Sequence, residues 1–302
     1  MAAMSIPLIR TSDELTLEDL TAKRTRRSLV SSLMTVLMGL SVVAVTIPLG
    51  AVLYTVVSKG ASVLSADFVT KDIPIVTRQV GPGMGPAIVG TLLITLVAAF
   101  MAVPVGILGA VYLNEYSAGG RFGKLVRFMA TVMTGVPSVV MGLFVYITYT
   151  LRYKQNAFGG SLALSFLMLP IIIRSTEEML KLVPSNLREA SAAMGSRKSR
   201  TILTVVLPAA LPGVVSGCLL AVARAAGETA PILFVVGATN TVNANMFNGV
   251  NTALSAQIFT NAQQPFVGAQ QRAWGAALTL LTLAFAITLV ARLITARFAL
   301  KR

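Results

Sequence analysis

The feature that most constrains this chain is a succession of long apolar blocks separated by short polar segments. The hydrocarbon core of a bilayer is about 30 Å thick, so a helix needs about 20 mostly apolar residues to cross it. Blocks of that length recur along the chain, and only 12% of its residues are charged, against about 25% in soluble proteins. The sequence therefore predicts an all-α polytopic membrane protein.

Six transmembrane helices are predicted from these blocks. Their approximate ranges are 28–57, 87–113, 125–150, 161–173, 201–238 and 274–294. Pro104 and Pro137 interrupt the second and third, which membrane helices tolerate when neighbours satisfy the freed carbonyl. The fifth is too long for one straight helix at about 1.5 Å per residue, so we expect an entry segment to about Leu207 and a break near Pro231. The stretch 239–272 is predicted to be a loop.

The basic residues predict the orientation of these helices. A polar tail over residues 1–27 precedes the transmembrane domain, which we assign to residues 28–296, and a basic tail follows over 297–302. Lys and Arg number 18 on the side that carries both tails and 6 on the other side. Positive charge favours cytoplasmic segments, so both termini are predicted to be cytoplasmic. This topology accounts for the formal net charge of +14 without a nucleic-acid partner.

A short helix is predicted on the cytoplasmic side at about residues 185–196, between the fourth and fifth spans. Ser185 is the expected N-cap, and Gly195 should end the helix because glycine adopts a positive φ without strain. Four residues at i, i+3, i+4 and i+7 form a small apolar face: Leu187, Ala190, Ser191 and Met194. Such a helix indicates a docking element for a soluble partner, although an ordinary basic loop explains the spacing equally well.

The residues of this stretch resemble the signature of the permease subunits of ATP-binding-cassette importers. That signature is a Glu-Ala-Ala triplet, a glycine about three residues on, and an Ile-x-Leu-Pro end. The matching residues are Glu189-Ala190-Ser191, Gly195 and Val205-Val206-Leu207-Pro208. Ser191 and Val205 depart from the pattern by small changes. The resemblance implies a type I importer permease fold, in which this segment is a coupling helix that sits in a groove of the ATPase subunit. The coupling residues would be Leu187, Glu189, Ala190, Met194 and Gly195.

A second resemblance is more specific and, with several shorter stretches, covers most of residues 86–296. The segment from Arg224 to Pro231 is similar to the RAxGETAP segment in permease subunits of the phosphate-specific transporter. The resemblance implies a phosphate importer in the plasma membrane of a prokaryote, in which this chain and a second permease subunit form the pore. It also implies a pair of ATPase subunits, which would hold ATP and magnesium, and an external phosphate-binding protein. This chain itself would carry no cofactor.

Arg224 and Glu228 are the one oppositely charged pair inside an apolar run. Being four residues apart, they would share one face of a helix and reach each other. An ionisable group inside the membrane marks a substrate path or an internal partner, and a guanidinium presents a planar fork of donors that suits an oxyanion. We therefore expect Arg224 to lie on the substrate path, held by Glu228. The alternative is a self-neutralising pair packed against the partner subunit.

Two further residues are candidates for the substrate path. Arg174 lies at the cytoplasmic end of the fourth span, where it could equally extend its charge to the membrane interface. The phosphate-permease resemblance includes an arginine in this arm. Thr229, beside Glu228, could donate its hydroxyl to an anion or bond its own helix backbone.

Several other functions have little support in the sequence. The chain has no histidine, which excludes histidine-based metal sites and catalytic triads, and its one cysteine, Cys218, lies in an apolar run. Gly123-Lys124 does not end a phosphate-binding loop, because Leu125 follows, so we expect ATP to bind on another chain. We expect this chain to be a non-catalytic subunit. A permease for another oxyanion, such as sulfate or molybdate, is the nearest alternative. An intramembrane enzyme or assembly factor would need a larger polar set than one Arg-Glu pair.

Overall fold

The computed structural model describes residues 26–79, 81, 83–117 and 119–299, and the chain divides into two compact units, Met1–Tyr54 and Thr55–Arg302. All regular secondary structure in the described residues is helical. The N-terminal tail predicted over 1–27 lies, up to residue 25, outside the described residues, as do residues 300–302 of the C-terminal tail. Helix α2 (Arg26–Ala61) is long and apolar enough over Leu29–Ala61 to cross a membrane.

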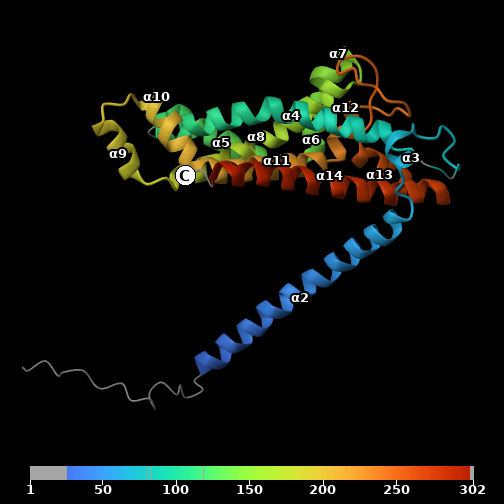
Figure 1. The fold of residues 1–302 in the computed structure, drawn as a ribbon, viewed down its shortest axis with the longest axis horizontal. Coiled ribbons are helices and arrows are strands. Elements are labelled where there is room, and N and C mark those ends of the chain that lie inside the picture. Colours follow the sequence, from blue (N-terminus) through green and yellow to red (C-terminus); the bar gives the residue numbers. More distant parts are fainter. Residues whose placement is uncertain (1–25, 80, 82, 118, 300–302) are drawn as a thin grey trace, which may run out of the picture. The chain divides into compact units, whose positions relative to one another are not determined.

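Four further helical stretches of the second unit are also long and apolar enough to cross a membrane. They are α4 (Gly85–Val111) with the π-helical turn η1 (Tyr112–Tyr116), α8 (Ala157–Lys181), the run from α10 (Lys198–Thr201) through η3 (Ile202–Val206) to α11 (Leu207–Ala226), and α14 (Val267–Ala299). Figure 1 shows α4, α8, α11 and α14 lying lengthwise beside one another. Pro104 stays inside α4 without ending it.

The remaining crossing is a bent pair of helices. Helix α5 (Arg121–Gly135) ends at Val136-Pro137, and α6 (Ser138–Val145) leaves at an angle of 106° before continuing through η2 (Tyr146–Thr150) and α7 (Leu151–Tyr153). The extended backbone of Val136 explains the break, because a residue before proline avoids the helical region. Since α5 follows η1 at one end of the unit and α7 lies at the other (Figure 1), the pair crosses the whole unit. The described residues thus hold five helices long and apolar enough to span, or six if the bent pair is one span, which agrees with the six crossings predicted from the sequence.

Helix α8 lies at the centre of the second unit and packs against α4 on one side and α11 on the other. Glycines allow these close approaches, because a Cβ on Gly106 would lie 2.6 Å from Ile172 and one on Gly217 would lie 2.3 Å from Ser175. Small residues at helix crossings are the usual means of packing in membranes, where no hydrophobic driving force brings helices together. The core formed in this way includes Ala98, Ala102, Leu164, Met168, Ile172, Val214, Ala221 and Ala225.

The two ends of the bundle differ. One end carries the short helix α9 (Ser185–Ala193) and α10, and the other carries α3 (Ala66–Thr70), α12 (Ala230–Val235) and α13 (Leu254–Ala262) (Figure 1). The central pocket and the exposed helix described below are therefore separated along the bundle.

The prediction of a loop over residues 239–272 is wrong in two places. Helix α13 forms within it, and α14 begins at Val267, seven residues before Trp274. Leu254 is fully buried, and its backbone N–H donates to Thr91 Oγ1 at 2.8 Å, so tertiary contacts order this Asn- and Gln-rich segment. Arg272 is 1% exposed and donates to the carbonyls of residues 77 and 79. Arg272 is therefore a buried residue of α14 that holds the segment 77–79 against this helix, and it is not an exposed charge on a loop.

Other helix limits also differ from the predicted ones. Helix α9 has Pro184 at its N-cap with no side-chain cap, so the predicted role of Ser185 is wrong. The break predicted near Pro231 in the fifth span is confirmed and lies at residues 227–229, since α11 ends at Ala226 and α12 begins at Ala230. Helix α14 continues to Ala299, past the predicted end near Ile294.

Candidate functional site

A pocket of about 200 Å³ lies where two interrupted helices meet. One interruption is the bend between α5 and α6, and the other is the break between α11 and α12. Helix α8 closes the pocket between them. Its lining residues are Met133, Thr134, Val136, Pro137, Ser138, Leu167, Met168, Pro170, Ile171, Ala221, Arg224, Ala225 and Glu228. Nine of these thirteen residues are apolar, and the two charged ones, Arg224 and Glu228, are those that the sequence singled out.

Arg224 and Glu228 both reach this pocket, but not from one helix. Helix α11 ends at Ala226, so Arg224 lies in its last turn and Glu228 lies in the break that follows. The Nε atom of Arg224 is 3.8 Å from Oε1 of Glu228, and the exposed fractions of the two side chains are 70% and 19%. The expected shared helix face is therefore wrong, although the two groups are near each other. At that distance the contact is loose, and the guanidinium keeps its donors available.

The break that carries Glu228 is held in place by two neighbouring elements. Ser255 of α13 donates its hydroxyl to the backbone carbonyl of Glu228 at 2.9 Å. On the other side α6 and α12 are in contact, since a Cβ on Gly142 would lie 2.6 Å from the Cα of Pro231. The two interruptions are thus packed together, which brings Arg224 next to the α5–α6 bend.

Ser138 is a pocket residue that sequence reasoning did not select. It is the first residue of α6, directly after Pro137 at the N-cap. The first N–H groups of a helix have no partner within the helix and attract anions. The Gly-Val-Pro-Ser segment at 135–138 could have indicated Ser138, because a proline there breaks one helix and begins the next. A guanidinium, a hydroxyl and a helix N-terminus together form a set of donors suited to an oxyanion.

Arg174 and Thr229 lie near the pocket without lining it. Arg174 is exposed on α8, one turn beyond Ile171 and on the same helical stripe as Leu167. Thr229 is the N-cap residue of α12 and makes no side-chain cap. The structure therefore brings Arg224 and Glu228 together in the pocket and sets these two candidates at its margin.

The predicted coupling residues lie on an exposed helix at one end of the bundle. Glu189 and Ala190 are at least partly exposed on α9, and Leu187 (43%) and Met194 (85%) are exposed beside them. Gly195 ends the helix with φ +75°, which confirms its predicted conformation. Ser191 instead points back towards α10, where its Oγ lies 2.8 Å from Oγ1 of Thr201. It therefore does not belong to the exposed apolar face.

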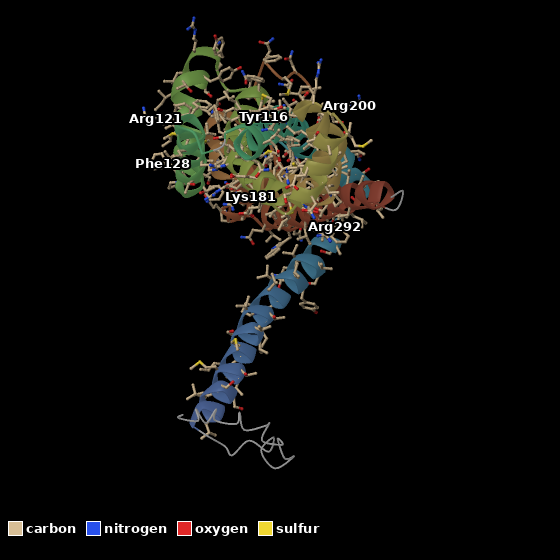
Figure 2. The ribbon with its side chains drawn as sticks, turned by 90° about the vertical axis from the view of Figure 1, so that its left-hand side faces the viewer. Tyr116, Arg121, Phe128, Lys181, Arg200 and Arg292 are labelled. Atoms are coloured by element: carbon tan, nitrogen blue, oxygen red, sulfur yellow. The ribbon has the colours of Figure 1, made fainter. Side chains whose placement is uncertain are left out.

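Basic side chains gather at the end of the bundle that carries α9. Figure 2 looks onto this end and shows Arg121, Lys181 and Arg200 around it, with Tyr116 between them. Sequence reasoning used the basic residues of this end only to orient the chain. It missed the ion pairs that some of them form with Glu115 and Glu177. Within the described residues, no group of three or more His, Cys, Asp or Glu side chains is placed to hold a metal ion.

These features together define a class of protein. Six helical crossings, a central pocket at two broken helices and an exposed short helix at one end are the parts of a membrane transport subunit. Residues 102–300 match the family model for the inner membrane component of binding-protein-dependent transport systems. The family match makes this chain a multi-pass transport subunit and not an enzyme.

Two relatives narrow the assignment. The phosphate transport system permease protein PstA 1 of Mycobacterium tuberculosis is 42% identical over 273 residues, which cover 89% of this chain and 90% of the relative. The corresponding PstA protein of Mycobacterium leprae is 41% identical over 268 residues, with 87% and 88% covered. The chain belongs to the family of phosphate transport system permease proteins PstA.

A solved structure supports the fold. A chain of a bacterial alginate ABC transporter, crystallised with a periplasmic protein bound to an alginate pentasaccharide, superposes with a TM-score of 0.63. The match covers 91% of this chain and 98% of that chain at 15% sequence identity. It establishes the architecture of a type I ABC importer permease and carries nothing about the substrate.

Proposed function

We propose that this chain is the permease subunit of an ATP-driven phosphate importer and forms half of its heterodimeric pathway. Its proposed partners are a second permease subunit of the PstC type, a pair of PstB-type ATPase subunits that hold ATP and magnesium, and an external PstS-type phosphate-binding protein. The assembly would lie in the plasma (inner) membrane of a prokaryote, with both termini and α9 in the cytoplasm. The phosphate assignment is supported by the function that the names of the PstA relatives give them.

The observation that carries the proposal is that Arg224 is exposed and only loosely paired with Glu228. The side chain of Arg224 lines the pocket and is 70% exposed, and its ion pair with Glu228 is 3.8 Å long. A guanidinium bonded tightly to a carboxylate would have few donors left, whereas this one can offer its fork to a tetrahedral oxyanion. Glu228 lowers the cost of the positive charge while the pocket holds no anion.

The remaining polar groups extend this proposed path. Ser138, at the start of α6, also lines the pocket and would share the oxyanion with Arg224. Arg174 continues the pocket face of α8 toward the end that carries α9, so it would receive the anion as it leaves. Thr229 would contribute its hydroxyl from the rim of the break. ATP-driven closure of the ATPase pair would move α9 and alternate access to this path.

The test is phosphate uptake by the complete transporter in proteoliposomes. Arg224→Ala removes charge-assisted hydrogen bonds worth roughly 3 kcal/mol, so uptake should fall about 100-fold. Arg224→Lys keeps the charge without the fork and should recover only part of the activity. Arg292→Ala, an exposed arginine on α14, is the matched control and should transport normally. Intact uptake by Arg224→Ala at normal subunit levels would remove the substrate-path role.

The choice of anion needs its own measurement. Sulfate and molybdate, supplied in excess, should leave uptake of radiolabelled phosphate unchanged if phosphate is the substrate. Inhibition by either anion at concentrations similar to those of unlabelled phosphate would instead assign the pocket to another oxyanion.

A further inference from the structure

Two carboxylates are buried near the end of the bundle that carries α9. Glu115 lies in η1, at the end of α4, with 7% of its side chain exposed, and Glu177 lies in α8 with 2% exposed. Each forms an ion pair 2.8 Å long with an arginine from a different element, Glu115 with Arg188 of α9 and Glu177 with Arg127 of α5. Neither pair belongs to the pocket.

Arg188 attaches α9 to the ends of α4 and α8. Its Nη2 donates to Glu115 Oε1 at 2.8 Å and to the carbonyl of Leu180 at 3.0 Å, while Nη1 donates to the carbonyl of Val183 at 2.7 Å. One side chain therefore joins α9 to the ends of both α4 and α8. No residue of α9 is itself buried, so apolar packing contributes little to this attachment.

Arg127 makes the corresponding connection for α5. Its Nε donates to Glu177 Oε1 at 2.8 Å, and its Nη2 donates to the carbonyl of Leu113 at 2.8 Å. Leu113 and Glu115 are both in η1, so the two arginines hold the same turn from different sides. Seven residues after Arg127, on the same face of α5, Thr134 lines the pocket.

These contacts form a continuous mechanical connection from the exposed helix to the pocket. It runs from α9 through Arg188 to η1, and from η1 through Arg127 to α5, whose far end forms the bend at Pro137. Glu177 ties the same arginine to α8, which forms another wall of the pocket. A buried carboxylate and a guanidinium separate only at a large energetic cost, so a displacement at one end of the chain of contacts is passed to the other.

We propose that Glu115, Arg127, Glu177 and Arg188, here called the arginine–carboxylate cluster, couple movement of α9 to the opening and closing of the pocket. The four residues are positioning residues, since none contacts the proposed substrate path. The inference rests on the proposed function, because it needs an ATPase that moves α9 and an anion that passes Arg224. It adds a route to the pocket through α5, beside the covalent route through α10 and α11.

The test measures phosphate transported per ATP hydrolysed by the reconstituted complete transporter. Arg188→Gln and Arg127→Gln should each lower this ratio about 10-fold, while the complex still assembles and hydrolyses ATP. Arg188→Lys, which keeps the charge but not the fork, should lower the ratio as well. Arg121→Gln changes an exposed arginine six residues before Arg127 on the same helix and should leave the ratio unchanged.

Two outcomes would overturn the proposal. If the variants lower only the amount of assembled complex, with an unchanged ratio in what remains, the cluster is merely structural. If the double variant Arg127→Gln/Arg188→Gln loses about 100-fold, the two arginines act independently; one shared connection predicts a loss no greater than that of either single variant. Failure of the phosphate assignment would appear differently, as absent phosphate uptake by the unaltered transporter.

Discussion

The ion pair at the pocket differs from the ion pairs near α9, and the difference separates the proposed roles of the two regions. At the pocket, Arg224 and Glu228 are 3.8 Å apart, and the arginine is largely exposed. Near α9, Arg127–Glu177 and Arg188–Glu115 are 2.8 Å long, and both carboxylates are buried. The first pair leaves donors open to a ligand, whereas the other two use theirs on the protein.

Sequence spacing alone does not produce this difference. Glu177 and Lys181 are also four residues apart, and they form a contact of 2.9 Å inside the continuous helix α8. Arg224 and Glu228 have the same separation, but the helix ends between them. The break between the two charges of Arg224 and Glu228 therefore goes with a looser contact than the one inside the continuous helix.

The largest predicted effect is on stability, when the carboxylate of one tight pair and the carboxylate of the loose pair are each removed. Glu177→Leu strands Arg127 beside a buried apolar side chain and should lower the free energy of unfolding by about 3 kcal/mol. Glu228→Leu should cost less than about 1 kcal/mol, because its partner Arg224 is 70% exposed and 3.8 Å away. Unfolding of the purified subunit in detergent measures both. Equal losses for the two variants would erase the distinction between the pairs.

A second effect should come from the contact that packs the two broken helices together. Gly142→Ala places a methyl group against Pro231 and should cost about 1–3 kcal/mol by overpacking. Because α6 and α12 must move apart, phosphate uptake should fall with stability. Gly109→Ala is the matched control, since its methyl group would meet Ile173 at an ordinary 3.7 Å. A harmless Gly142→Ala would show that the pocket does not depend on this contact.

The smallest effect concerns the end of α9. Gly195 has φ +75°, and a methyl group on its Cα would meet nothing within 4 Å, so Gly195→Ala adds only backbone strain, about 1 kcal/mol. Gly195→Asn should be better tolerated, because asparagine visits this conformation more readily. Phosphate transported per ATP hydrolysed should fall slightly for alanine and less for asparagine. The reverse order would mean that the side chain, and not the backbone, matters there.

Much of the architecture could be predicted from local sequence features. Lengths of apolar runs indicated the crossings, Pro137 indicated the break in the third, and Gly195 indicated the end of α9. The 106° angle at Pro137 was beyond reach, because it depends on how α6 packs against α12. The same is true of the break beside Glu228, which a helical spacing argument placed inside a helix.

The long-range contacts that join neighbouring elements could not be predicted from the sequence either. Arg188 and Glu115 are 73 residues apart, and Arg127 and Glu177 are 50 apart. No local pattern pairs such residues, so the charges could be read only as signs of orientation. Arg272 illustrates the same limit, since it was assigned to a loop yet bonds carbonyls 193 and 195 positions earlier in the chain.

The two helix breaks at the pocket have a consequence for solvation. Near Pro137 and Glu228, backbone N–H and carbonyl groups leave the helical ladder inside segments that cross the membrane. Hydrocarbon offers such groups no partner, so they persist only beside protein or water. The carbonyl of Glu228 has such a protein partner, since it accepts a hydrogen bond from the hydroxyl of Ser255 at 2.9 Å. If an anion follows the proposed path, backbone groups at the two breaks would replace part of its water shell.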